Sequence, residues 1–243
     1  NRRDVSLRSN IANIDIVGDY RLSTLPSSLA FVLEKSLPTL SEWLLNYKSN
    51  RNLPHITANN FLIDAQLLPT EFYKNVLHIP LEINSDLTLQ CNINETNGTA
   101  HTALYIPNIS YNDNYVRNGI IDLNSDNGET FIEITGSYSN YTIVDNYISI
   151  DLSAKNDSLD TNIKWQSIDK DHLQLNLSAQ TIFEEFNNQE KWLKSSHQIK
   201  DSEFSYSSTN WDISDFFIAT DSGKISLNNF NLANNEQNIH ADG

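Results

Sequence analysis

Apolar and polar residues alternate along most of this 243-residue chain, and this alternation limits its fold more than any other feature. Three runs show it most clearly, at residues 87–93, 147–154 and 172–179. Successive side chains of a β-strand point to opposite faces, so each run would place its apolar groups on one face and its polar groups on the other. The pattern is typical of antiparallel strands with one covered face. The chain is therefore predicted to be mainly β.

Turn-forming dipeptides separate the alternating runs at Asn97-Gly98, Asn127-Gly128 and Ser222-Gly223. If each forms a two-residue hairpin turn, the apolar positions of the flanking strands lie opposite one another, and a slip by one residue would set apolar against polar. The expected pairs are Leu89 with Ile106, Cys91 with Leu104, Ile121 with Ile134, Leu123 with Ile132, and Ile218 with Leu227. Further turns are expected at Asn140, 156–158 and 169–171. The sequence thus predicts an antiparallel meander of about ten strands over residues 79–240.

The N-terminal third has a different pattern. Residues 13–20 are predicted to form a strand, and residues 24–48 an amphipathic helix, because leucines recur there at a spacing of 3.6. Thr24 is expected to cap this helix, and Pro38 to kink or split it. Shorter helices are expected at residues 70–77 and 184–194. Without a linker rich in Gly or Pro, we expect one continuous unit, with the strand and helix in 1–78 and the meander in 79–243.

The composition narrows the possible partners and the setting. The chain has 16 Lys and Arg against 31 Asp and Glu, a formal net charge of −15, and such a surface repels the phosphates of nucleic acids. No run approaches the ~18 apolar residues of a membrane span, and residues 1–30 lack the apolar centre of a signal peptide. The chain contains no Met, even at position 1, which predicts a piece of a longer protein.

Motifs for catalysis or cofactor binding are missing from the sequence. The single Cys91 is expected on the apolar face of its strand, where burial makes a thiol unreactive. Seven glycines in the whole chain make a phosphate-binding loop improbable. The histidines have no local metal-binding spacing; they are His55, His78, His101, His172, His197 and His240. We therefore expect no enzyme activity, no cofactor and no metal.

One segment imitates a calcium-binding loop. Asp122, Asn124 and Asp126 place oxygen ligands at alternate positions, and Glu133 stands at the twelfth position. The glycine, Gly128, comes one place late for an EF-hand, and the same residues fit a hairpin. In that hairpin Asp122 and Glu133 oppose each other on the polar face, where they repel unless water or a cation separates them.

The alternation leaves two architectures open. The apolar face of a ten-strand meander must be covered, either by closure into a sandwich or barrel or, in an open gutter, by another molecule. One helix of 25 residues cannot cover ten strands. A carbohydrate-binding β-sandwich or cell-surface adhesin is one alternative, in which Trp165, Trp192 and Trp211 line a sugar-binding face, although such residues more often serve cross-strand packing.

Several short motifs resemble those of one protein family. Residues 211–213 form a W-x-I, residues 223–232 a G-x-I-x-L-x-N-F-x-L pair of strands, and residues 237–243 a Q-x-I-x-x-x-G end. This block resembles a recurring block of TamB, the translocation and assembly module proteins of Gram-negative envelopes. Residues 18–29, which lead into the amphipathic helix, and residues 106–111 also resemble TamB-like elements. Together the matching points span most of the chain.

The resemblance implies the gutter rather than the closed fold. TamB and its AsmA-like relatives resemble bridge-type lipid transfer proteins, in which an elongated β-sheet curls into an apolar groove between the inner and outer membranes. A TamB-like chain would lie in the periplasm and be held in the inner membrane by an anchor outside this fragment. It would carry phospholipid acyl chains, support outer-membrane biogenesis and work with a TamA-type outer-membrane barrel protein. The family has no catalytic residues or cofactor.

The residues expected to line such a groove are the inward members of the alternating runs, and their alternative role is plain core packing. They are Leu87, Leu89, Cys91, Ile93, Leu104, Ile106, Ile121, Leu123, Ile132, Ile134, Ile148, Ile150, Leu152, Leu173, Leu175, Leu177, Ile218, Ile225 and Leu227.

Overall fold

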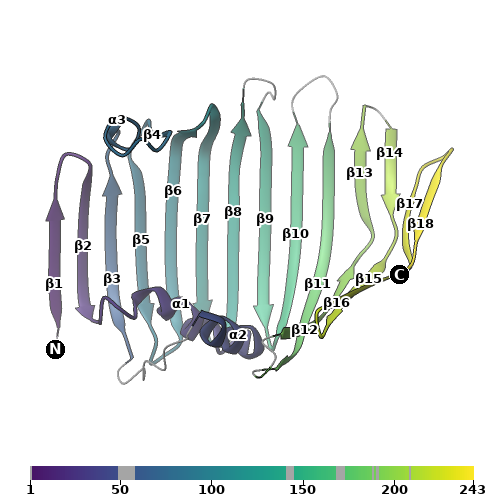
Figure 1. Ribbon diagram of the computed structural model, residues 1–243, viewed down its shortest axis with the longest axis horizontal. Coiled ribbons are helices and arrows are strands. Elements are labelled where there is room, and N and C mark those ends of the chain that lie inside the picture. Colours follow the sequence, from purple (N-terminus) through teal and green to yellow (C-terminus); the bar gives the residue numbers. More distant parts are fainter. Residues whose placement is uncertain are drawn as a thin grey trace.

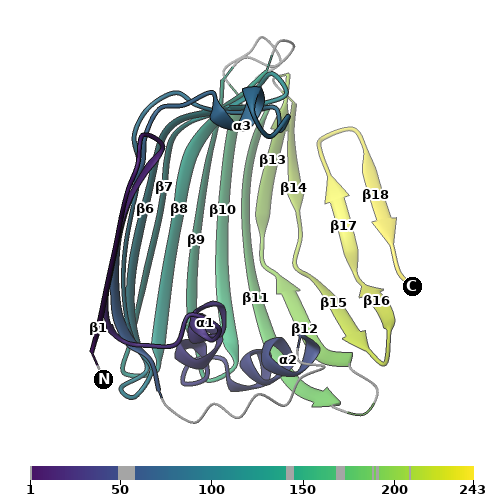
Figure 2. The ribbon, with the colours of Figure 1, turned by 60° about the vertical axis from the view of Figure 1, so that its left-hand side comes forward.

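The computed structural model describes residues 2–48, 58–140, 145–167, 173–187, 189, 192–207 and 209–243. These residues form one open antiparallel sheet of 18 strands with three helices (Figure 1). The mainly β prediction is confirmed, and a curled gutter fits the shape of the sheet (Figure 2). The predicted turn at residues 169–171 lies outside the described residues.

The elements follow one another along the chain with short connections. The helices are α1 (Leu25–Leu33), α2 (Pro38–Lys48) and α3 (Phe72–Asn75). The first eleven strands are β1 (Arg3–Arg8), β2 (Ala12–Asp19), β3 (Asn60–Leu67), β4 (Leu81–Ile83), β5 (Leu87–Asn94), β6 (Thr99–Tyr111), β7 (Asn114–Asp126), β8 (Glu129–Ser139), β9 (Asn146–Lys155), β10 (Ser158–Ser167) and β11 (Gln174–Asn187). The remaining strands are β12 (Trp192–Ile199), β13 (Ser202–Tyr206), β14 (Thr209–Ile213), β15 (Phe216–Asp221), β16 (Lys224–Asn228), β17 (Phe230–Ala233) and β18 (Asn238–Ala241).

From β1 to β11 the strands pair in chain order, except that the short β4 and the longer β5 both pair with β6. Beyond β11 the strands are interrupted along one line that runs across the sheet. Both β12 and β13 pair with β11, and the register shifts by one residue between Ile199 and Ser202. The neighbouring strands break at the same level, because β15 pairs with β12 while β14 pairs with β13. A β-bulge of this kind bends a strand and increases its twist. Four strand paths are divided in this way, into β4 and β5, β12 and β13, β14 and β15, and β16 and β17. The 15 strands from β4 to β18 therefore follow 11 paths, close to the predicted number of about ten.

Two of the three predicted hairpin registers are confirmed. Ile121 pairs with Ile134, Leu123 with Ile132, and Ile218 with Leu227. At both turns the two central residues have positive φ: 52° and 79° for Asn127 and Gly128, and 50° and 74° for Ser222 and Gly223. This is the geometry that a two-residue hairpin turn of type I′ requires.

The predicted register around Asn97-Gly98 is wrong by two residues. Asn94 pairs with Thr99, so Leu89 faces Leu104 and Cys91 faces Thr102. Of the dipeptide, only Gly98 has positive φ, and its N–H donates to the carbonyl of Glu95 at 3.2 Å, which makes a four-residue loop. Because the slip is an even number of residues, every side chain keeps its predicted face.

The predicted long helix is split at Pro38, which begins α2. Thr24 stands at the start of α1 but does not cap it through its side chain, because its hydroxyl donates backwards to the carbonyl of Arg21 at 3.1 Å. The short helix expected at 70–77 is present as α3. The helix expected at 184–194 is wrong: this part of the chain includes the end of β11 and the start of β12, which pair with each other. Cross-strand pairing there overrides the local helical pattern.

The first two helices lie across one face of the sheet, at the ends of the strands that are lowest in Figures 1 and 2. Val32 of α1 is 0% exposed and packs into a core cluster with Tyr20, Phe61, Ile93, Ala100 and Leu123. Two polar contacts hold the hairpin tips against the helices. Ser36 and Thr130 share a buried hydrogen bond of 2.8 Å, and Asp157 accepts the N–H and hydroxyl of Thr39, each at 2.9 Å. The small sealed core therefore lies under the helices, and the rest of this face extends beyond them.

Candidate functional site: an open apolar face

Apolar side chains form continuous rows across the sheet, perpendicular to the strands. In the central row each residue lies opposite the next in register; the row comprises Leu7, Ile14, Ala65, Leu89, Leu104, Ile121, Ile134, Ile150, Ile163 and Leu177. With neighbouring strands about 4.8 Å apart, ten strands make a row about 43 Å long. We refer to the side of the sheet that carries this row, and on which α1 packs, as the apolar face.

A second row runs parallel to the central one, toward the helices. It contains Val5, Ile16, Ile63, Cys91, Thr102, Leu123, Ile132, Leu152, Thr161, Ala179, Ile199 and Phe216. A third row, on the other side of the central one, includes Ile148, Trp165, Leu175, Phe204 and Trp211. The apolar face is thus several residues wide from the second row to the third.

Eighteen of the nineteen residues predicted to line a groove lie in strands, and the registers place all eighteen on the apolar face. The nineteenth, Leu173, directly precedes β11. Only Ile93 and Leu123 of the set are buried, Ile225 is 76% exposed, and the others are half-buried. In a closed core these side chains would be shielded from water on all sides. The described strands make one sheet, so no second sheet packs on this face within the described part of the chain.

The molecular surface agrees with an uncovered face. The accessible area is 14753 Å², whereas a compact monomer of 27.6 kDa is expected to expose about 11,000 Å². The surplus is about a third of the expected value. An unclosed sheet accounts for it, because one layer of strands and a pair of short helices bury less area than two packed layers.

Prediction missed the contribution of the N-terminal third to this face. Ile14 and Ile16 of β2 and Ile63 of β3 extend both rows beyond the meander. The alternation of β3 was visible in the sequence, but its position between β2 and β5 depends on the long connections through α1 and α2 on one side and through α3 and β4 on the other. Ile163 of β10 was also missed, because Thr161 and Trp165 flank it and weaken the alternation.

The opposite face is mainly polar, and its exposed apolar side chains include Leu62, Tyr105, Ile120, Phe131, Ile182 and Phe217. Asp122, Glu133 and Asp151 stand directly opposite one another on β7, β8 and β9. The predicted opposition of Asp122 and Glu133 is therefore present, and the calcium-like segment is part of the β7–β8 hairpin rather than a loop that wraps an ion. Among the described residues, no group of three or more His, Cys, Asp or Glu side chains is arranged to hold a metal ion.

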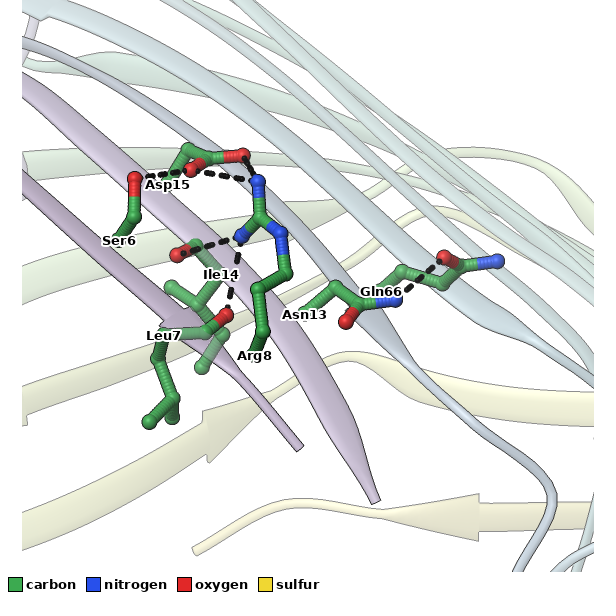
Figure 3. Close-up of polar contacts among 7 residues, drawn as sticks. All are labelled: Ser6, Leu7, Arg8, Asn13, Ile14, Asp15 and Gln66. Carbon is green, nitrogen blue, oxygen red and sulfur yellow. Dashed lines mark hydrogen bonds and ion pairs between the residues drawn. The ribbon is translucent and has the colours of Figure 1, made fainter. Parts of the chain in front are cut away.

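An ion pair on the same polar face holds the edge hairpin together (Figure 3). Arg8 of β1 donates to both carboxylate oxygens of Asp15 on β2, at 2.9 and 2.6 Å, and Ser6 donates to the same carboxylate at 2.7 Å. The hydrogen bond from Arg8 lowers the pKa of Asp15. Arg8 also reaches the carbonyls of Leu7 and Ile14, so its side chain joins the two strands at their connected end.

Cys91 lies half-buried on the apolar face as predicted. Burial raises the pKa of its thiol, and the hydroxyl of Thr102 donates to Sγ at 3.3 Å and partly opposes that rise. Among the predicted sugar-binding aromatics, Trp165 and Trp211 are separated in the third row by Leu175 and Phe204. Trp165 donates its indole N–H to Asn146 at 3.1 Å.

Four polar side chains also lie on the apolar face, where β11, β12 and β15 meet. They are Thr181, His197, Ser195 and Thr220, joined in that order by three hydrogen bonds. Only the pairing of distant strands brings them together, and no local spacing in the sequence indicated it. His55 and His172 lie outside the described residues.

No protein-family model matches this chain, and neither a curated protein nor a solved structure was found to be similar to it. Among the described residues, no helix has the length and apolar content to cross a membrane.

Proposed function

We propose that this chain is a segment of a TamB-like envelope protein, and that its apolar face carries phospholipid acyl chains between the inner and outer membranes. The observation that supports this proposal most directly is the exposure of the apolar rows. Eighteen residues chosen for alternation share one face, and only two of them are buried. A face of this kind is favourable only when another apolar surface removes it from water.

An acyl chain suits the face in shape and chemistry. The central row is continuous and carries only aliphatic side chains. Each methylene removed from water contributes about 0.8 kcal/mol, and this contribution requires no particular orientation. The absence of charged side chains from the row favours chains that slide along it rather than a single fixed ligand.

The remaining parts of the proposal rest on the resemblance to TamB. The protein would work in the periplasm, anchored in the inner membrane outside this segment, with a TamA-type outer-membrane barrel protein as partner. It would have no enzyme activity and no cofactor. The formal charge of −15 is compatible with a surface that does not adhere to anionic lipid headgroups.

Paired aspartates on the apolar face test this function. In the double variant Ile150→Asp with Leu175→Asp, we expect a native circular dichroism spectrum and loss of phospholipid capture, because charges on the lining exclude acyl chains. The matched control is Ser149→Asp with Asn176→Asp, neighbouring positions that face the polar side. This control should fold and capture phospholipid like the native chain, as measured by native mass spectrometry.

Two results would overturn the proposal. Unfolding of the first variant alone would mean that these side chains form a closed core. A native chain that captures no phospholipid but binds glycans through its exposed tryptophans and tyrosines would instead favour an adhesin or carbohydrate-binding protein.

A further inference from the structure

The four polar side chains on the apolar face form one hydrogen-bonded chain across three strands. Thr181 Oγ1 lies 2.8 Å from His197 Nδ1, His197 Nε2 lies 3.0 Å from Ser195 Oγ, and Ser195 Oγ lies 2.7 Å from Thr220 Oγ1. Their other cross-strand neighbours on this face are apolar: Leu159, Phe183, Ile218 and Ile225. Ser195 is 5% exposed, whereas the other three are half-buried. We refer to these four residues as the polar chain.

The polar chain has one more proton than its internal hydrogen bonds use. Three hydroxyls and a neutral imidazole supply four donors, and the three internal bonds take three of them. If the bonds run from Thr181 toward Thr220, the proton left over belongs to Thr220. Its nearest protein acceptors are then the carbonyls of Leu193 and Ser195, at the long distances of 3.4 and 3.5 Å. If the bonds run the other way, the proton left over belongs to Thr181, whose hydroxyl has no second protein partner within the described residues.

In the first direction Thr220 has weak acceptors within the protein, whereas in the second direction the Thr181 hydroxyl proton needs an acceptor from outside the protein. Water satisfies it while the face is open. A cargo that covers the face expels this water, and a buried donor without an acceptor opposes binding. A pure hydrocarbon would leave the proton unpaired, whereas a ligand with a carbonyl oxygen could accept it.

We propose that the polar chain is a recognition site for the ester carbonyl of an acyl lipid whose hydrocarbon chain lies on the neighbouring apolar rows. This inference rests on the proposed lipid-binding function and adds a preference within it. Acyl esters are selected over hydrocarbons of the same length, and the ester is placed where β11, β12 and β15 meet.

The chemistry of the site suits an uncharged acceptor. No charged side chain belongs to the polar chain, and desolvation by burial lowers the pKa of His197, which favours its neutral form. A phosphate would lack a cation here, so the phosphate of a phospholipid would lie outside the site, in solvent.

Displacement of a bound fluorescent hydrocarbon, diphenylhexatriene, measures the preference. An alkane and the methyl ester of a fatty acid of the same length compete for the native chain. We expect the ester to displace the probe at about tenfold lower concentration, equivalent to about 1.4 kcal/mol. In the fourfold variant Thr181→Val, Ser195→Ala, His197→Leu and Thr220→Val no donor of the polar chain remains, and the two competitors should become equal. The control Thr161→Val removes a hydroxyl from the same face outside the polar chain and should keep the ester preference.

The possible outcomes separate the two proposals. If the native chain binds diphenylhexatriene but does not distinguish ester from alkane, the recognition site is rejected and the lipid-binding function stands. The same conclusion follows if the fourfold variant keeps the preference or if the control loses it. If the native chain binds neither the probe nor the competitors, both proposals fail.

Discussion

At the level of residues, some apolar side chains of the sheet and helices are fully buried, whereas others of the same type remain accessible to solvent. Val32 is fully buried among Tyr20, Phe61 and Leu123, and such a side chain stabilises the fold by about 1.5–3 kcal/mol. Ile150 has the same apolar character but stays half-buried, because no element covers it. The two positions differ in tertiary context rather than in residue type.

His197 predicts a pH dependence of stability. Burial lowers its pKa from 6.5 in the folded chain, so below about pH 6.5 the unfolded chain binds more protons at this residue. Stability should therefore fall as the pH drops through this range toward the lower folded pKa. Urea denaturation of the native chain and of His197→Gln at pH 7.5 and 5.5 measures the effect, and the variant should lose less stability between the two values.

The carboxylates act with the same sign at lower pH. Hydrogen bonds lower the pKa of Asp15, Glu184 and Asp242 from their usual 3.8–4.5, so the stability they contribute is lost only as the pH falls below those values.

The His197 prediction has a clear contrary outcome. An equal loss of stability in the native chain and in His197→Gln between pH 7.5 and 5.5 would contradict the assignment to His197.

At the level of elements, alternation and turn geometry specify most of the meander. The registers at Asn127-Gly128 and Ser222-Gly223 were predictable because a type I′ turn allows one pairing of its flanking strands. The β5–β6 register was not, because a four-residue loop also satisfies the residues around Gly98. The aligned breaks between β12 and β13 and between β14 and β15 have no sequence signal of their own, since each depends on the strand beside it.

Gly18 offers a test of close packing between β2 and β3. Its φ is 146°, and a Cβ there would lie 2.2 Å from the carbonyl oxygen of Asn60 and 2.7 Å from the Cα of Phe61. Gly18→Ala should therefore destabilise the fold by about 3–5 kcal/mol, because backbone atoms would have to move. In the control Gly223→Ala the new methyl meets nothing within 4 Å, so only the left-handed backbone at φ 74° opposes it, at about 1–2 kcal/mol. Equal losses in thermal or urea denaturation would contradict this account.

At the level of the whole molecule, the open sheet has a protected middle and two free edges. Among the described strands, β7 to β10 pair along their length on both sides, whereas β1 pairs only with β2 and all six of its residues are exposed. Within the same set of strands, the C-terminal β18 pairs only with β17. An edge strand presents backbone groups to water and opens at a lower free energy than a central one.

Hydrogen exchange should follow this gradient. Amides of β8 and β9 are expected to exchange slowest, and those of β1 and β18 fastest, as measured by mass spectrometry of peptides after pulsed deuteration. Phospholipid would be expected to slow exchange further under the apolar rows if it binds there. Uniform protection from β1 to β18 would indicate that the edges are covered in solution and would contradict the open sheet.

Sequence alone determined which side chains share a face. A period of two assigns each residue of a strand to one side, and this local rule survived even where the β5–β6 register was wrong by two residues. Tertiary structure decided whether that face would close. Closure depends on the accumulated bend of many strands, on the one-residue bulge after Ile199 and on the position of α1 over the second row. Each of these features arises between residues that are distant in the chain. For the same reason, the four residues of the polar chain came together only in the folded sheet.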